Sequence, residues 1–250
     1  MKTATCIRLV LIFGAIAVLE LLCRTKVIAP ITMVPPSVML IGVFELLASG
    51  RVLPDLLRTL ASVATVICIS VIGGILIGVL LFRAARLRQI VDPLLTTWYA
   101  IPAFIFYPIL VAIFGLSTLP IILIAVKFAI VTMIVNTLNG LDRVPQVMRK
   151  VARVHRLGRF DTFRLVVLRN MAPSLMGGFK LTTAYSFIGV IASEFLLSTA
   201  GLGFSIARAY ESFETRRMYS LMLLIVGIAI LLNAGLFIWE RRMLARRFNR

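Results

Sequence analysis

The sequence is poor in the side chains that most enzymes use for catalysis. Its 250 residues include one histidine, His155, three cysteines and ten acidic residues. Cys6, Cys23 and Cys68 lie in or beside apolar segments and lack the paired spacing of a metal site or a disulfide. The sequence also shows no Cys/His or carboxylate cluster. We therefore expect no catalytic centre, no metal and no cofactor in this chain, which argues against a membrane enzyme.

Polar residues are in the minority as well. Hydrophobic residues make up 60% of the chain, and the mean hydropathy is +1.03. That is far more apolar surface than one soluble core can bury. A net charge of +17 would suit a nucleic-acid-binding protein, but the basic residues fall between long apolar runs. We therefore expect a lipid bilayer around the chain and no nucleic acid partner.

Long uncharged runs predict the membrane spans. A span needs about 20 mainly apolar residues, and residues 59–82 and 218–239 meet that length without a charge. A longer uncharged run, 93–126, contains a turn signal at 115–120 that divides it into two helices. The N-terminal apolar segment has no convincing cleavage site, so we interpret it as an uncleaved first span. We predict an all-α polytopic membrane protein with one domain, 1–250, and about six transmembrane helices, near 6–23, 59–82, 94–114, 119–138, 173–197 and 218–239.

The distribution of Lys and Arg predicts the orientation. If the N-terminus is cytoplasmic, the inside segments hold 18 basic residues and the outside segments hold 7. Because basic residues concentrate on the cytoplasmic side of membrane proteins, both termini are expected in the cytoplasm. Outside, residues 37–50 and 199–217 are each expected to contain a short helix. Gly73, Gly74 and Gly78 are expected to serve close helix packing.

Residues 141–169, here called the basic loop, separate the fourth and fifth predicted spans. The loop carries eight basic residues and an apolar stripe, with a break between two short helices expected at Gly158. The stripe consists of Val147, Val151, Val154, Leu157, Phe160, Phe163 and Val167. An exposed apolar stripe invites a protein partner, whereas the basic residues would also suit anionic lipid headgroups. The residues alone leave both interpretations open.

Short motifs recur in order along nearly the whole chain. They are Pro35-Pro36-Ser37, Leu47-Ala48-Ser49-Gly50, Asp92-Pro93-Leu94-Leu95, Ile101-Pro102, Asn136-Thr137-Leu138-Asn139-Gly140, Ala172-Pro173, Gly177-Gly178, Ala192-Ser193-Glu194-Phe195 and Gly201-Leu202-Gly203-Phe204. In order and spacing they resemble the permease subunit of type I ABC importers, the binding-protein-dependent transport family. The likeness is greatest to the nitrate, sulfonate and taurine-type permeases.

The basic loop departs from this family's signature, E-A-A-x-x-x-G. The family glutamate is Lys150 here, the family glycine falls on Arg156, and the proline after the apolar run is Arg169. Two explanations stay open, namely a heterodimer whose other permease carries the standard loop, or divergence together with a co-adapted ATPase. The residues that the resemblance assigns to ATPase coupling are Lys150, Ala152, Arg153, Arg156, Gly158, Phe160, Phe163 and Arg164.

The resemblance implies a transport subunit of a bacterial inner membrane. Its implied partners are a cytosolic ABC ATPase dimer, a second permease copy or a paralogue, and an extracytoplasmic solute-binding protein. The chain has no Gly-x-x-x-x-Gly-Lys-Ser/Thr phosphate loop, so ATP would be hydrolysed by a separate subunit. The implied solute is small and anionic, such as nitrate, sulfonate or taurine. The alternative is a secondary transporter or another small polytopic protein without an ATPase, although no clear internal repeat supports it.

Charged and aromatic residues inside the spans are candidates for the solute path. Lys127 is the most unusual of them, because it lies mid-span where an apolar or small residue is expected. It would attract an anionic solute or pair with an acid of a partner permease. Lys180, near an inner helix end, is expected to snorkel. The candidates for the path are Trp98, Tyr99, Phe104, Lys127, Tyr185 and Glu194.

Overall fold

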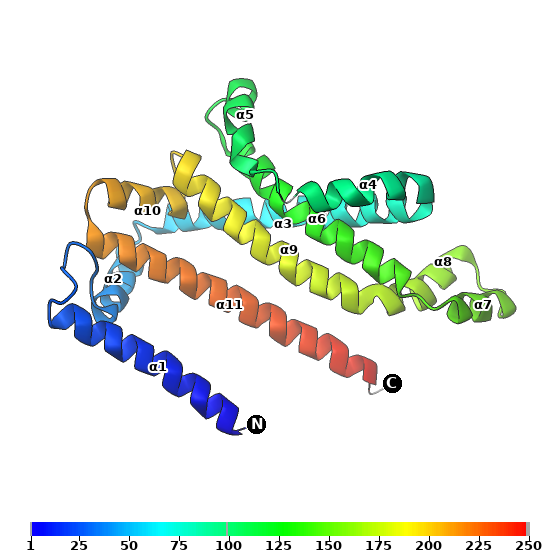
Figure 1. Ribbon diagram of the computed structural model, residues 1–250, viewed down its shortest axis with the longest axis horizontal. Helices are drawn as coiled ribbons and strands as arrows, with labels where there is room; N and C mark the ends of the chain where they lie inside the picture. Colours follow the sequence, from blue (N-terminus) through cyan, green and yellow to red (C-terminus); the bar gives the residue numbers. More distant parts are fainter. Residues whose placement is uncertain (1, 99, 249–250) are drawn as a thin grey trace. The chain divides into compact units, whose positions relative to one another are not determined.

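The computed structural model describes residues 2–98 and 100–248, with side chains left undescribed at 2–5, 8, 149, 159 and 244–248 (Figure 1). The described chain is helical, as predicted. Its helices are α1 Lys2–Arg24, α2 Pro36–Ala48, α3 Leu53–Arg83, α4 Ala85–Trp98, the 3-10 helix η1 Ala103–Phe106, α5 Tyr107–Phe114, α6 Thr118–Asp142, α7 Gln146–Val154, α8 Arg159–Asp161, the π-helix η2 Thr162–Val167, α9 Leu168–Leu197, α10 Leu202–Glu211 and α11 Thr215–Phe248.

Four helices of the described residues are long and apolar enough to cross a membrane. They lie at Leu53–Arg83, Thr118–Asp142, Thr162–Leu197 and Thr215–Met243, and α4 with α5 makes a fifth if this bent pair is one span. Helix α1 covers the predicted first span but is outside this count, and some of its side chains lie outside the described set. The number of six spans therefore stays a prediction.

The chain divides into two compact units, which α3, α9 and α11 join. Unit 1 comprises Met1–Arg58 and Glu194–Leu231, and unit 2 comprises Thr59–Ser193 and Leu232–Arg250. Unit 1 contains the two short helices expected outside the membrane, since α2 lies within the predicted 37–50 region and α10 within 199–217.

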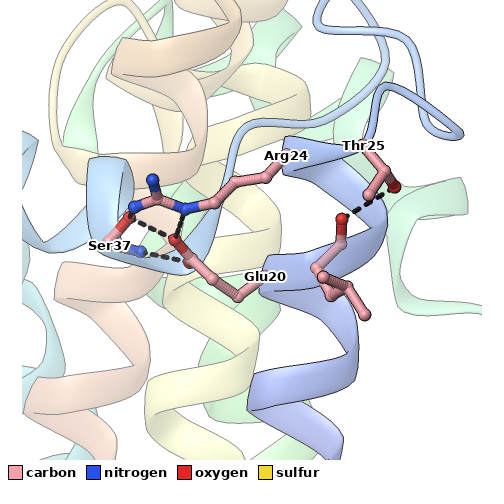
Figure 2. Close-up of polar contacts among 5 residues, drawn as sticks. Glu20, Arg24, Thr25 and Ser37 are labelled. Carbon is pink, nitrogen blue, oxygen red and sulfur yellow. Dashed lines mark hydrogen bonds and ion pairs between the residues drawn. The ribbon is translucent and has the colours of Figure 1, made fainter.

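A carboxylate joins α1 to α2 in unit 1. Helix α2 begins with Pro36, and proline at the first helical position leaves Ser37 as the first free backbone donor. The Glu20 carboxylate of α1 accepts from the Ser37 backbone N–H at 3.0 Å and from its hydroxyl at 2.7 Å. Arg24 Nε also donates to Glu20, at 2.6 Å (Figure 2). A negative side chain thus caps the positive end of α2, an arrangement that stabilises a helix N-terminus.

Two further carboxylates cap α10 in unit 1. Asp55, in the first turn of α3, accepts from the Gly201 backbone N–H at 3.0 Å and from the Ser205 hydroxyl at 2.5 Å. The buried Glu194 accepts from the Gly203 backbone N–H at 3.1 Å. The motifs around Glu194 and Gly201 therefore meet in space, because the carboxylate of the first supplies the acceptor that the helix begun by the second requires.

Unit 2 is built on close contacts between α3, α6 and α9. A Cβ added at Gly74 would lie 2.5 Å from Met133 Cβ, and one at Gly78 would lie 2.7 Å from Thr137 Cβ. A Cβ at Gly178 of α9 would lie 2.7 Å from Asn136 Cβ of α6. The prediction that glycines of the second span allow close helix packing is thus confirmed.

Two predicted segments differ from what the structure shows. A single helix was expected over 94–114, but the chain forms α4, then a break, then η1 and α5, with a bend of more than 40° (Figure 1). The second helix expected in the basic loop is not a separate element, because α8 and η2 continue directly into α9.

Lys180 was expected to snorkel, yet its Nζ lies 2.7 Å from Glu240 Oε2 of α11.

Gly201→Ala should destabilise unit 1. Gly201 has a φ of 108°, and its added methyl group would overlap the Glu194 carboxylate. We expect a loss of about 2 kcal/mol or more, from backbone strain and overpacking together, measured as a lower melting temperature in detergent.

Gly227→Ala in α11 is the matched control, because nothing lies within 4 Å of the methyl group it would add. Equal melting temperatures for the two variants would contradict the described cap of α10.

Candidate functional site: a lysine at a broken membrane helix

The break between α4 and η1 leaves a backbone acceptor without its usual helical partner. In a continuous helix the Ile101 carbonyl would accept from the N–H of Ile105. The Ile105 N–H instead donates to the Pro102 carbonyl at 3.3 Å. Pro102 has no N–H, so it cannot continue the helix from α4 either. Inside a bilayer, the freed Ile101 carbonyl must find another donor.

Lys127 of α6 supplies that donor. Its Nζ donates to the Ile101 carbonyl oxygen, and in return the Trp98 indole Nε1 donates to the Lys127 carbonyl at 3.1 Å. These two contacts join α6 to the end of α4 and to the break itself. They also show which groups compensate the Lys127 ammonium within the span. The sequence alone had left three candidates for this role: a water-filled pore, an acidic residue of a partner, or a passing anion.

Aromatic rings surround the lysine. Its Nζ lies 5.5 Å from the Trp98 ring centroid and 5.8 Å from that of Phe128. Phe128 in turn lies 6.1 Å from Phe104 of η1, centroid to centroid. Rings within about 6 Å of a cation attract it through their electron-rich faces. The half-buried Lys127 is therefore held by a carbonyl and two rings.

The structure brings together three of the six predicted path residues, namely Trp98, Phe104 and Lys127. Tyr99 lies outside the described residues. Tyr185 of α9 is 39% exposed, and no described contact joins it to Lys127. Glu194 belongs to unit 1, where it is buried and caps α10, so its described contact favours a structural role.

The basic loop begins with a short helix, α7, that ends in a defined turn. The Arg156 N–H donates to the Arg153 carbonyl at 3.0 Å, and the Leu157 N–H donates to the Ala152 carbonyl at 3.0 Å. This pair of bonds is the Schellman motif, whose first residue beyond the C-cap adopts the left-handed conformation and is usually glycine. Arg156 occupies that position with a φ of 53°. The resemblance aligns the family glycine with this residue, so the chain keeps the turn while replacing the residue that adopts it most easily.

The apolar stripe of the basic loop is exposed in this chain. Val147 is 68% exposed, Val154 80% and Phe160 72%. Val151 and Phe163 are also exposed, whereas Ala152 is buried on the other side of α7. Lys150, Arg153, Arg156, Gly158 and Arg164 are all exposed as well. The loop therefore presents apolar and basic side chains together, as its sequence predicted.

An ion pair joins the base of this loop to the broken helix. Arg88 in the first turns of α4 donates to both carboxylate oxygens of Asp142, at 2.9 and 2.7 Å, and also lies 3.3 Å from Asp92. Asp142 is the last residue of α6 and lies at the start of the basic loop. Trp98, which contacts Lys127, ends the same helix α4. One helix thus reaches from the loop base to the lysine.

Sequence reasoning missed several of these residues. Asp142, Arg88, Phe128 and Asp55 were not among the candidates. The pairing of Arg88 with Asp92 could have been found from their i, i+4 spacing. Arg88 and Asp142 lie 54 positions apart, and no local pattern connects them.

Comparison with known proteins shows the family of the chain. The family described as "Binding-protein-dependent transport system inner membrane component" matches residues 70–250, which is most of the chain. The chain belongs to this family. The resemblance inferred from the sequence is therefore confirmed, and so is the prediction of a transport component instead of an enzyme.

Over the matched stretch, about a quarter to a third of the residues are identical between the chain and its relatives. The nitrate import permease protein NrtB of Leptolyngbya laminosa is 31% identical over 176 residues, covering 70% of this chain and 63% of the relative. The taurine transport system permease protein TauC of Escherichia coli is 26% identical over 174 residues, covering 70% of this chain and 63% of the relative. The matched stretch thus spans slightly less than two thirds of either relative.

A solved structure supports the fold. A chain from inward-facing conformations of the MetNI methionine ABC transporter matches with a TM-score of 0.64 and 19% identity. The match covers 78% of this chain and 95% of that chain. At this identity the likeness shows the fold alone, and it confirms the prediction of an all-α membrane fold like that of importer permeases.

Lys127→Met should destabilise unit 2, because it leaves the Ile101 carbonyl without the donor described here. Ile101 is exposed in this chain, but its carbonyl lies in a predicted span, where no water is available to replace the lost donor. We therefore expect the melting temperature in detergent to fall.

Lys127→Arg keeps a cationic donor and is the matched control, expected to melt closer to the unchanged chain. If the methionine variant melts like the unchanged chain, the lysine does not support the break.

Proposed function

We propose that the chain is the permease subunit of an ABC importer, forms the solute path, and couples to ATPases on separate chains. The observation that carries the proposal is the exposed basic loop at the inner end of α6 and α9, in a chain of the transport family. The membrane is a bacterial inner membrane, and both termini lie in the cytoplasm. The distribution of basic residues supports that orientation.

A second permease, identical or paralogous, completes the path. Within one chain, the candidate spans are buried to very different extents. In the most apolar stretch of each helix, 50% of the residues are buried in α6, 28% in α3 and 6% in α11. Lipid covers part of the remaining surface, and a partner permease covers another part, because a solute path needs walls on every side.

The ion pair between Arg88 and Asp142 carries movement from the basic loop to the path. An ATPase that binds the loop pulls on the end of α6, where Asp142 lies. Because Arg88 binds Asp142 through two parallel hydrogen bonds, α4 follows that movement. The other end of α4 carries Trp98, so the movement reaches Lys127 and the helix break. Breaks of this kind are places where a membrane helix can change direction between two states.

The transported solute is small and carries an anionic group, as nitrate, sulfonates and taurine do. The names of the relatives point to nitrate and taurine. Lys127 places an ammonium group at a helix break, where it attracts anions. An extracytoplasmic solute-binding protein delivers the solute.

A cavity in unit 1 that is bordered by charged side chains is the candidate surface for that binding protein. It has a volume of about 590 Å³ and lies among α2, α10 and the start of α11, on the side predicted to be external. Two ion pairs border it, Glu45 with Arg216 at 2.8 Å and Glu214 with Arg217 at 3.3 Å. Exposed charged pairs of this kind can exchange partners with a docking protein at low cost.

Replacing Phe160 and Phe163 with Asp should uncouple the transporter. Phe160 is 72% exposed and Phe163 45% exposed in the single chain, so the change removes only part of one ring's packing. Charges within an apolar contact would weaken ATPase binding. We expect ATP hydrolysis stimulated by the permease, measured in proteoliposomes, to fall by roughly tenfold or more.

Phe213→Asp is the matched control, since Phe213 is 79% exposed but belongs to unit 1, far along the chain from the basic loop. Undiminished stimulation in the Phe160/Phe163 variant, with correct insertion, would contradict the proposed coupling and favour a loop that rests on lipid.

A further inference from the structure

We propose that the basic loop binds an apolar groove of the ATPase whose rim is acidic. This inference rests on the proposed function, because it specifies the chemistry of the partner that the loop contacts. Its first basis is charge. Between Asp142 and Asp161 the sequence contains six basic residues and no acidic residue. Asp142 is already bound to Arg88, so it leaves the charge of the loop uncompensated.

The second basis is the arrangement of the exposed side chains on α7. Val147, Val151 and Val154 follow one another at i, i+4 and i+7 and are 68%, 45% and 80% exposed. On a helix, Lys150 lies on the same side, between Val147 and Val154. The valines thus form a narrow apolar ridge with a lysine directly beside it. Such a ridge fits a groove with an apolar floor.

The third basis is the state of the charges beside the ridge. Lys150, Arg153 and Arg156 are exposed, and the ion pairs of the described chain involve none of these three residues. A partner that covers the valines must approach these cations. Carboxylates on its rim would complement them, whereas basic residues would be repelled, because like charges at an interface cost several kcal/mol.

A protein groove explains α7 better than a lipid surface does. Helices that lie in the membrane interface usually carry Trp, Phe or Leu on their apolar face. The apolar residues of α7 are valines, one methionine and one alanine, and the exposed Phe160 and Phe163 of the basic loop lie outside this helix. The Schellman turn at Arg156 also fixes the end of the helix, so the ridge has a defined length and direction. A defined shape is useful for fitting a groove and unnecessary for resting on headgroups.

Charge reversal at Lys150 tests this inference. The chain is reconstituted in nanodiscs of phosphatidylcholine alone, and the affinity of the ATPase that co-purifies with it is measured. Lys150→Glu introduces the acid that the resemblance gives to the family. It should nevertheless weaken ATPase binding by roughly tenfold or more, with Lys150→Gln intermediate. Raising the salt concentration should weaken binding to the unchanged chain more than to Lys150→Gln.

Two controls separate charge from misfolding. Arg51→Glu makes the same reversal at an exposed position of unit 1 and should leave ATPase affinity unchanged. Arg153→Glu makes it at a second position of the loop and should weaken binding as Lys150→Glu does. Melting temperatures in detergent should be equal for all variants, because these side chains are exposed.

Two results would overturn the inference while leaving the proposed function intact. One is ATPase affinity that Lys150→Glu and Arg153→Glu leave unchanged or raise. The other is ATPase binding that is charge-independent in phosphatidylcholine, while the reversals abolish a loop contact that appears only when phosphatidylglycerol is added. Failure of the unchanged chain to bind any ATPase would instead overturn the proposed function itself.

Discussion

The polar ends of helices are the constraint on which this structure depends. A helix end that is buried in protein or in lipid has no water to bind its free N–H or carbonyl groups, so it needs a partner from the protein. The Glu20 carboxylate provides one for α2, and Asp55 and Glu194 provide two for α10. At the break between α4 and η1 the free group is a carbonyl, and the partner is the ammonium of Lys127. One requirement thus explains both the acids at the external segments and the lysine in the span.

The scarcity of acidic residues makes their positions informative. Most of the ten either cap a helix or pair with a basic residue in the described contacts. Asp142 and Asp92 hold Arg88 at the base of the basic loop, whereas the following stretch of the loop contains only basic residues. Charge is therefore balanced where helices of this chain meet each other. It is left unbalanced on the surface that we assign to a partner.

The helices and the family could be predicted because both depend on short stretches of sequence. The length of an uncharged apolar run marks α3 and α11, and the turn signal at 115–120 separates α6 from the helix before it. The order of short motifs gives the resemblance. The amphipathic stripe of α7 also follows from local periodicity. The exposure of its valines then agrees with the prediction of an unpartnered surface.

What could not be predicted depends on contacts between distant residues. The uncharged run through 94–114 indicated a helix, but nothing in it showed that Lys127 would stabilise a break near Pro102. Glu194 looked like a path residue because it is charged and lies near a span end. Its role as a cap depends on the backbone of Gly203, which only the fold brings close. Arg156 looked like a loss of the family glycine, and only its φ of 53° shows that the turn is kept.

The central claim is that Arg88 and Asp142 connect the basic loop to the solute path. The most direct test is the amount of solute taken up per ATP hydrolysed, measured in proteoliposomes for single and paired charge reversals. Arg88→Asp and Asp142→Arg should each lower this ratio severalfold, because each places like charges where the ion pair lies. The double variant restores an opposite pair and should recover most of the ratio. If the single variants keep the ratio of the unchanged chain, or if the double variant is no better than the worse single one, the connection does not exist.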